Sequence, residues 1–310
     1  MELGAILALG GDNMELRLLN YFLAVAREQS ISAAAESLHI SQPALSVQLK
    51  SLEDEFGKKL FIRGTKGARR VVLTDDGMLL RKRAEEIMTL VRKTEDEMNS
   101  ADTIAGEVVI GAGETDIIRY FARTARCLQA EHPDIHYHIY SGNAEYVLEY
   151  LDKGLIDFGL LFTDIDENKY EFIDLPVHDH LGLLVQESSP LAARAEIKPA
   201  DIEGIPLIVS LQKGDLDYIA RWAGRGASEL NIVATYNLVF NATLLVEEGV
   251  GSAVCFDKLV NTSGRGLCFR PFSPPLEVSA RIVWKKYQVF SKAASAFFRC
   301  LEETIGIKNK

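Results

Sequence analysis

The sequence predicts a multidomain fold with an all-α winged helix-turn-helix domain, a linker helix and a two-lobed α/β domain. Three observations predict it. Short capped helices precede a basic hairpin in residues 14–73, apolar residues follow a heptad spacing through 74–100, and strands alternate with helices from residue 106 onward. A chain of 310 residues is long enough for two or three such domains.

Composition and charge indicate where a partner could bind. The chain is 47% hydrophobic and 25% charged, as expected for a globular protein with a sizeable core. Its formal net charge of -10 argues, as an average, against a nucleic-acid partner. Residues 14–73, however, hold nine basic and six acidic side chains. A basic N-terminal section on an acidic body is typical when only one module contacts phosphate.

Cysteine spacing and hydropathy indicate the compartment. The four cysteines, Cys127, Cys255, Cys268 and Cys300, form no CxxC pair, so they predict buried thiols rather than a disulfide framework or a zinc site. No apolar run is long enough to span a membrane. Residues 1–13 lack the basic start of a signal peptide and are interpreted as an extension outside the fold. We expect a cytoplasmic protein with no membrane partner.

The N-terminal section predicts a helix-turn-helix. Apolar residues recur at helical spacing over 16–29, and a second helix begins at Ser30 or Ser32. After a tight turn, Ser41 can cap a third helix, with Pro43 in its first turn. One buried stripe is predicted on the third helix, formed by Leu45, Leu49, Leu52 and Phe56.

The opposite face of the third helix is a candidate for reading DNA bases. At about 100° per residue it carries Pro43, Val47, Lys50 and Asp54, and Gln42 lies at its N-terminal tip. Amide and apolar groups suit adenine and the methyl group of thymine. The helix alone is equally compatible with an ordinary solvated face.

The hairpin that follows favours the DNA interpretation. The segment "GKKLFIRGTKGARRVVLT" predicts two strands around a glycine-rich basic tip. Residues 58–70 hold six basic side chains and no acid, which suits contact with the phosphate backbone. A solvated turn is the alternative, and the neighbouring helix-turn-helix makes it the weaker one. The segment is therefore interpreted as a wing.

At these motifs the chain resembles a known family. Residues 14–78, with "YFLAVA", "AAESLHISQPALS", "LEDEFGKKLF" and "LTDDG", closely resemble the DNA-binding domain of LysR-type transcriptional regulators. The resemblance implies that Gln42, Pro43 and Ser46 lie at the DNA. The family usually has Arg where this chain has Val47, which puts one familiar contact in doubt. The predicted DNA-binding residues are Ser41, Gln42, Pro43, Ser46, Val47, Lys50, Arg63, Lys66, Arg69 and Arg70.

Residues 74–100 predict a linker helix, capped by Thr74 and with acidic residues in its first turn. Apolar residues alternate at steps of four and three, which favours pairing with a second chain over packing on its own domain. The resemblance implies the same linker-helix dimer, and a homodimer or a dimer-of-dimers tetramer is expected. The predicted dimer residues are Leu80, Ala84, Ile87, Val91 and Met98.

Residues 101–310 predict two α/β lobes. Strands alternate with helices, which indicates parallel sheets with covered faces. Lobe I is expected at about 106–177 and 277–310, and lobe II at about 178–276. Two such lobes with a cleft between them are typical of periplasmic-binding-protein-like effector domains. LysR-type regulators are similar throughout, so the resemblance spans nearly the whole chain from residue 14.

Ligands of such sheets lie beyond the carboxyl ends of the strands, beside helix N-termini. The residues expected there are Gly113, Glu114, Thr115, Ser141, Gly142, Asn143, Ser210, Tyr236, Asn237, Asn241 and Phe256. Taken singly, each is better explained as a turn or a cap, and their convergence makes them candidates as a set. Glu114 and Asp116 oppose a strongly anionic ligand, so we expect a small polar metabolite with an acceptor end and a donor or amine end.

Other functions are less well supported. His136 with His138, and His178 with His180, share strand faces but have no third metal ligand near them in sequence. No nucleophile elbow, phosphate loop or metalloprotease helix occurs. A redox sensor with a reactive cysteine is a further alternative, less well supported because no basic cluster surrounds Cys127 or Cys255, although Arg126 precedes Cys127. We therefore predict a LysR-type transcriptional regulator that binds double-stranded promoter DNA, with no catalytic residue, metal or cofactor. A non-regulatory small-molecule binding or assembly protein is the alternative, and an enzyme comes third.

Overall fold

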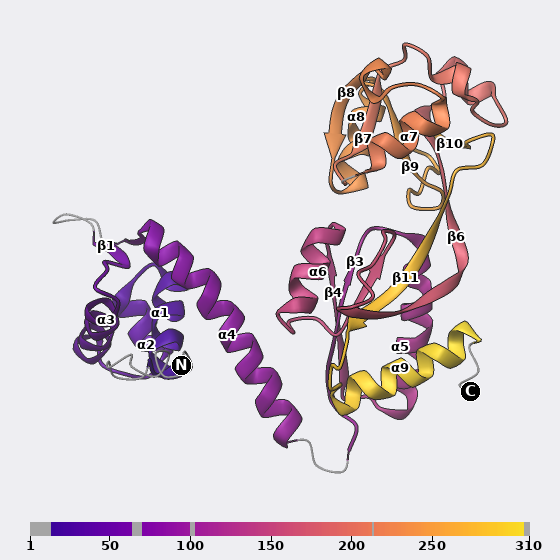
Figure 1. Ribbon diagram of the computed structural model, residues 1–310. Helices are drawn as coiled ribbons and strands as arrows, with labels where there is room; N and C mark the ends of the chain where they lie inside the picture. Colours follow the sequence, from indigo (N-terminus) through magenta and orange to yellow (C-terminus); the bar gives the residue numbers. More distant parts are fainter. Residues whose placement is uncertain (1–13, 64–69, 100–102, 213, 307–310) are drawn as a thin grey trace, which may run out of the picture. The chain divides into compact units, whose positions relative to one another are not determined.

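A computed structural model of the chain describes residues 14–63, 70–99, 103–212 and 214–306. The chain forms two compact units that meet between Met98 and Asn99 (Figure 1). We call them the N-terminal unit and the C-terminal unit and describe each by itself. The predicted extension, residues 1–13, lies outside the described residues.

The N-terminal unit is a helix-turn-helix with a two-stranded hairpin and a long helix. Its side-chain caps lie where the sequence placed them: Ser41 accepts a hydrogen bond from the Ala44 N–H at 3.3 Å, and Thr74 accepts one from the Gly77 N–H at 3.0 Å. Ser30, rather than Ser32, caps the second helix. The elements are α1 (Leu16–Glu28), α2 (Ile31–Ser37), α3 (Gln42–Phe56), β1 (Phe61–Arg63), β2 (Val71–Leu73) and α4 (Asp75–Asn99).

The core of this unit contains most of the predicted stripe on α3. Leu45, Leu49 and Leu52 are buried, but Phe56 is 42% exposed, so its predicted burial was wrong. Phe56 is the last residue of α3, and the chain turns at Gly57 in the left-handed conformation, so the ring lies beyond the packed stripe. The β1–β2 hairpin is antiparallel, with Phe61 opposite Leu73.

The C-terminal unit is built on one mixed sheet with the strand order β4-β3-β5-β11-β6-β9-β7-β8, and β10 pairs with β6. β3 is parallel to β4 and β5, and β7 is parallel to β8 and β9, as alternation with helices predicted. The strands are β3 (Gly106–Ala112), β4 (Ile135–Ser141), β5 (Phe158–Leu161), β6 (Tyr170–Gln186), β7 (Leu207–Ser210), β8 (Ile232–Tyr236), β9 (Ser252–Phe256), β10 (Leu267–Pro271) and β11 (Glu277–Lys285).

The helices of this unit begin close to their predicted positions. Residues 116–131, predicted as one helix, form a 3₁₀ turn, η1 (Asp116–Ile118), followed by α5 (Arg119–Glu131). The helix predicted from residue 241 begins earlier, at Val239, so Asn241 lies inside it rather than in a loop. The other helices are α6 (Ala144–Asp152), η2 (Pro190–Ala193), η3 (Pro199–Ile202), α7 (Asp215–Ala223), η4 (Ala227–Glu229), α8 (Val239–Glu247) and α9 (Lys292–Ile305).

Two long antiparallel strands join the two lobes. β6 pairs with β11 from Tyr170 to His180 and then with β9 from Leu181 to Leu184. β11 in turn pairs with β5 of lobe I. The sequence did not predict β6 or β10 as strands. β6 mixes polar and apolar residues irregularly along its first ten residues and becomes continuously buried only from Gly182 to Val185, so it lacks a single period-two pattern.

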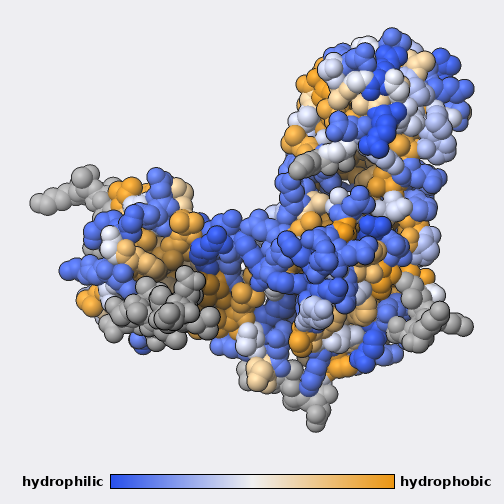
Figure 2. Space-filling view, viewed as in Figure 1, coloured by the Kyte–Doolittle hydropathy of each residue, from blue (hydrophilic) through white to orange (hydrophobic). Residues whose placement is uncertain are grey.

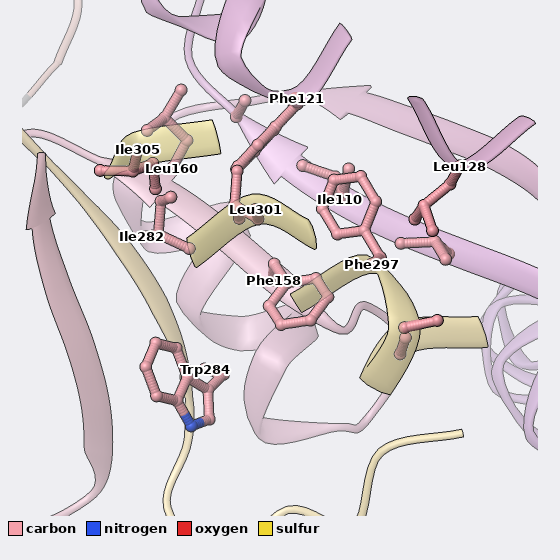
Figure 3. Close-up of a cluster of buried hydrophobic side chains, with 14 of the residues drawn as sticks. Ile110, Phe121, Leu128, Phe158, Leu160, Ile282, Trp284, Phe297, Leu301 and Ile305 are labelled. Atoms are coloured by element: carbon pink, nitrogen blue, oxygen red, sulfur yellow. The ribbon is translucent and has the colours of Figure 1, made fainter. Parts of the chain in front are cut away.

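Each lobe has its own hydrophobic core. In lobe I, α5 and α9 cover one face of the sheet, and Phe121 of α5 and Phe297 of α9 meet over Phe158 of β5 (Figure 3). A smaller cluster under α6 covers the other face. Lobe II has separate clusters that include residues of α7 and of α8. Within the part of the chain that the structure describes, no helix is both long enough and apolar enough to span a bilayer.

Candidate DNA and effector sites

The face of α3 opposite its buried leucines is open to solvent. Gln42, Pro43 and Lys50 are exposed, and Val47 is 64% exposed. Ser46 is half-buried, and the Ser41 hydroxyl serves as the helix cap. This face therefore presents an amide, an apolar branched side chain and a cation, a set that can contact base edges and a phosphate.

A buried carboxylate fixes the hairpin to α3. Glu53 accepts hydrogen bonds from the backbone N–H groups of Leu60 at 2.8 Å and Phe61 at 3.3 Å, and from the Lys59 ammonium at 3.1 Å. Burial disfavours the charged form, but these bonds outweigh it, so the pKa of Glu53 lies below its ordinary value. The ionised carboxylate thus sets where the wing leaves the recognition helix. The quoted motif "LEDEFGKKLF" contains Glu53, but the sequence did not indicate this role.

Only part of the wing is described. Lys66 and Arg69 lie outside the described residues, as does the side chain of Arg63. Arg70 is exposed and donates to the Gln29 side-chain oxygen at 2.6 Å, while the Val71 N–H donates to the Gln29 carbonyl at 2.8 Å. The base of the wing is therefore fastened to the end of α1.

The predicted seam of α4 divides into two parts. Ala84 is fully buried in the core of the N-terminal unit, and Leu80 and Ile87 pack against that core. The assignment of Ala84 to a contact with a second chain was wrong, because α4 crosses its own helix-turn-helix at that turn. Further along, Val91 is half-buried and Met98 is 81% exposed. Figure 2 shows apolar areas among the polar surface of this unit, and its exposed apolar side chains include Met78, Leu79 and Leu90.

Several predicted effector residues cap local structure in the C-terminal unit. Thr115 accepts a hydrogen bond from the Ile117 N–H at 2.9 Å, and Asn143 accepts one from the Tyr146 N–H at 2.9 Å. Ser210 accepts one from the Gln212 N–H at 3.1 Å. These are the cap functions that the sequence also allowed, and they hold the ends of β3, β4 and β7 in place.

Thr115 also anchors its loop to the crossing strand β6. Its hydroxyl donates to the carboxylate of Asp179, which is 6% exposed. Burial raises the pKa of Asp179, while the hydrogen bond from Thr115 acts in the opposite direction. Asp179 lies between His178 and His180, a pattern that indicates nothing about a partner 64 residues earlier in the chain.

Two contacts join loops of the two lobes at the ends of the strands, and a third pair of residues lies nearby. The Val239 N–H of lobe II donates to the Glu114 carboxylate of lobe I at 2.5 Å. The rings of Phe162 and Phe256 lie 5.2 Å apart. The Gln212 side-chain amide nitrogen lies 3.8 Å from the position that a Cβ at Gly113 would occupy. Gly113, Glu114 and Phe256 therefore do converge, together with Phe162 and Gln212, which the sequence did not single out.

The remaining predicted effector residues are exposed or serve packing and hydrogen bonding within one lobe. The Tyr236 hydroxyl donates to the Val254 carbonyl at 2.7 Å, so it is used inside lobe II. Ser141, Asn237 and Asn241 are exposed, and Gly142 packs so closely on the Tyr146 ring that a Cβ would lie 2.4 Å from it. Gly142 thus serves close packing.

A separate cavity of about 230 Å³ lies beside the crossing strands. Its lining comes from η1, α5, β6 and the turn at Asp257 and Lys258, and it includes Asp179. The predicted effector residues do not line it. Since Asp179 also bonds Thr115, that hydrogen bond connects the cavity wall to the loop that carries Glu114.

Two of the paired histidines contact a neighbouring strand, and of the four cysteines only Cys255 is buried, so the predicted burial of Cys127, which is exposed, was wrong. His178 lies 3.1 Å from the Ser279 hydroxyl, and His180 lies 3.5 Å from the Glu277 carboxylate, so both histidines contact β11. Among the described residues, no group of three or more His, Cys, Asp or Glu is placed to hold a metal. Burial raises the pKa of Cys255 to about 12 and that of Cys300 to about 11, so both thiols stay protonated near neutral pH.

Comparison with known proteins places both units in the same family. Residues 16–78 match the family described as "Bacterial regulatory helix-turn-helix protein, lysR family", and residues 101–306 match the "LysR substrate binding domain". The HTH-type transcriptional regulator BsdA of Bacillus subtilis (strain 168) is 31% identical over 199 residues, 63% of this chain and 67% of that protein. The uncharacterized HTH-type transcriptional regulator YnfL of Escherichia coli (strain K12) is 28% identical over 308 residues, 92% of this chain and 97% of that protein.

A solved structure shares the fold. The crystal structure of CbnR, a LysR family transcriptional regulator, matches with a TM-score of 0.74 at 21% identity, covering 94% of this chain and 99% of that chain. CbnR has also been solved at full length in complex with its target DNA.

Proposed function

The chain belongs to the LysR family of bacterial regulatory helix-turn-helix proteins and is a DNA-binding transcriptional regulator rather than an enzyme; from this premise we propose how it reads DNA, pairs with a second copy and responds to a ligand. The observation that carries the DNA proposal is the open face of α3 beside a hairpin held by Glu53. DNA as the partner also supports a cytoplasmic location.

In this proposal α3 enters the major groove and the wing follows the phosphate backbone. Gln42 contacts a base edge at the N-terminal tip, where recognition helices meet bases. Val47 offers a methyl contact, and Lys50, Arg63, Lys66, Arg69 and Arg70 supply charge to phosphates. Contacts to bases set sequence preference, whereas contacts to phosphates add affinity for any duplex and make it depend on salt.

Gln42→Ala should reduce discrimination between cognate and random DNA. A good bidentate contact contributes about 1–3 kcal/mol to discrimination, so the preference should fall by roughly 5- to 150-fold. Cognate duplexes selected from a random pool are titrated by fluorescence anisotropy at several salt concentrations. The Arg69→Ala/Arg70→Ala double variant is the comparison, because it should weaken binding to every duplex and flatten the salt dependence. If Gln42→Ala weakens cognate and random DNA equally, Gln42 does not read a base.

We propose that the second half of α4 pairs with α4 of a second copy. Leu80, Ala84 and Ile87 are engaged within their own unit, which leaves Val91 and Met98 for the partner. A groove of about 390 Å³ between α4 and β2, lined by Val72 and Met78 among others, offers further apolar surface on the same unit. A dimer suits DNA recognition because two heads can match a pseudo-palindromic site.

Val91→Lys should lower the oligomer order measured by sedimentation velocity, because the ammonium group would be buried at the pair without a partner. Val91 is a cleaner test than Ile87, since a charge at Ile87 would also disturb the core of the N-terminal unit. Thr89→Lys adds the same charge on the opposite side of the helix and serves as the control. An oligomer unchanged by Val91→Lys would place the interface elsewhere.

The ligand in this proposal is a small polar metabolite bound between the lobes near Glu114, Gln212 and Asn237. The neighbouring groups are a carboxylate, amides and the rings of Phe162 and Phe256, which suit an amino-acid-like or polar carbonyl compound with a donor or amine end. Binding acts on DNA occupancy by favouring one lobe arrangement, which requires different affinity for the two arrangements.

A thermal-shift screen of the full chain against polar metabolites should give hits that Asn237→Ala abolishes. Asn237 is exposed, so its removal should leave the unliganded melting temperature unchanged. Thr115→Ala and Asn143→Ala are poorer probes than the sequence suggested, because both side chains cap helices. Asn20→Ala, an exposed amide on α1, is the matched control. Hits that survive Asn237→Ala would place the ligand away from this position.

A further inference from the structure

The N-terminus of α8 in lobe II is capped by a residue of lobe I. The residue at the N-cap position is Leu238, whose apolar side chain cannot accept a hydrogen bond. The first N–H of the helix, that of Val239, donates instead to the carboxylate of Glu114, which lies 125 residues earlier in the loop after β3. A carboxylate is the group that the positive end of a helix dipole favours most. Lobe I therefore supplies the cap that the sequence of lobe II omits.

The loop that carries Glu114 is held on the lobe I side. The next residue, Thr115, bonds Asp179 on the crossing strand and accepts from the Ile117 N–H. Asp116 accepts a hydrogen bond from Arg119 at 2.5 Å. These bonds fix the backbone of the loop against β6 and α5. The reach of the Glu114 side chain to α8 then depends on the distance between the two lobes.

The same contact cannot persist if the lobes separate. Opening at the crossing strands would withdraw the carboxylate from Val239 and leave the first turn of α8 without a cap. The approach of the Phe162 and Phe256 rings there is apolar and imposes less direction. Of the side-chain contacts between these loops and α8, the charge-assisted hydrogen bond is therefore the directional one.

We propose that Glu114 is a latch that holds the two lobes together by capping α8 across the lobe boundary. A ligand group that pairs with the Glu114 carboxylate would break its hydrogen bond to Val239. A ligand carboxylate could instead take its place at the N-terminus of α8. Either event would change the arrangement of the lobes. Only the effect of a ligand on the latch rests on the proposed function. The contact between the lobes is a property of the chain whatever the ligand is.

The first test is hydrogen exchange of the full chain, read in peptides that cover the start of α8. Glu114→Ala should speed exchange there by roughly fivefold, the factor expected for loss of a typical N-cap. Sodium acetate should slow it again in Glu114→Ala, because free carboxylate can occupy the vacated position, and should leave wild type unchanged. Glu187→Ala, which removes an exposed carboxylate of lobe II, is the control and should change neither rate.

The second test separates a latch from a cap with no effect on the lobes. The lobe separation is measured by pulsed electron paramagnetic resonance between two spin labels. The labels are attached to unnatural amino acids at Asn168 of lobe I and Ser228 of lobe II, both of which are exposed. The distance distribution should broaden in Glu114→Ala and narrow again with acetate. An unchanged distribution, or exchange at α8 unaffected by Glu114→Ala, overturns the latch.

DNA binding keeps the two proposals apart. Glu114→Ala leaves the N-terminal unit intact, so it should still bind selected duplexes. If wild type binds them and Glu114→Ala shows no change in exchange or distance, the latch fails and the regulator stands. If wild type binds no DNA sequence selectively, the proposed reading of DNA fails, whatever the exchange data show.

Discussion

The antiparallel pairing of β6 with β11 is the interaction on which the C-terminal unit depends, because these strands carry the chain between the lobes. Their ladder runs from the pair Tyr170–Lys285 to the pair His180–Glu277, and β6 then continues into the sheet of lobe II. Backbone hydrogen bonds make this connection stiff along each strand while still allowing bending between the lobes. Asp179 lies on this ladder and accepts a hydrogen bond from Thr115. The loop nearest the proposed ligand is therefore held in position by the crossing strands.

The N-terminal unit uses a buried carboxylate for a comparable purpose. Glu53 is ionised within the core because backbone N–H groups of β1 and the Lys59 ammonium surround it, and it joins the recognition helix to the wing. The two elements that we propose to contact DNA are thereby kept in one geometry. In each unit a carboxylate thus positions a segment from a distant part of the sequence. Glu53 holds the start of the hairpin, and Asp179 holds the loop that contains Thr115.

The parts that could be predicted from the sequence are those whose causes are local. Ser41, Thr74 and Asn143 lie next to the N–H groups that they cap, so a cap and an apolar period suffice to place α3, α4 and α6. The parts that could not be predicted depend on distant partners. Ala84 has the spacing of a seam residue but is buried by its own unit, and Glu114 meets Val239 only after both lobes have folded. The strand β6 has no single local pattern because its neighbours change along its length.

We propose that this chain is a ligand-responsive regulator that binds DNA as a dimer. The most direct measurement is a footprint of the full-length protein on the DNA flanking its own gene, with and without small metabolites extracted from cells. We expect two protected half-sites about one helical turn apart, roughly 10 bp between centres, and a protection pattern that changes with the extract. Uniform protection of any duplex would contradict sequence-specific binding. A protection pattern that no extract changes would contradict the response to a ligand.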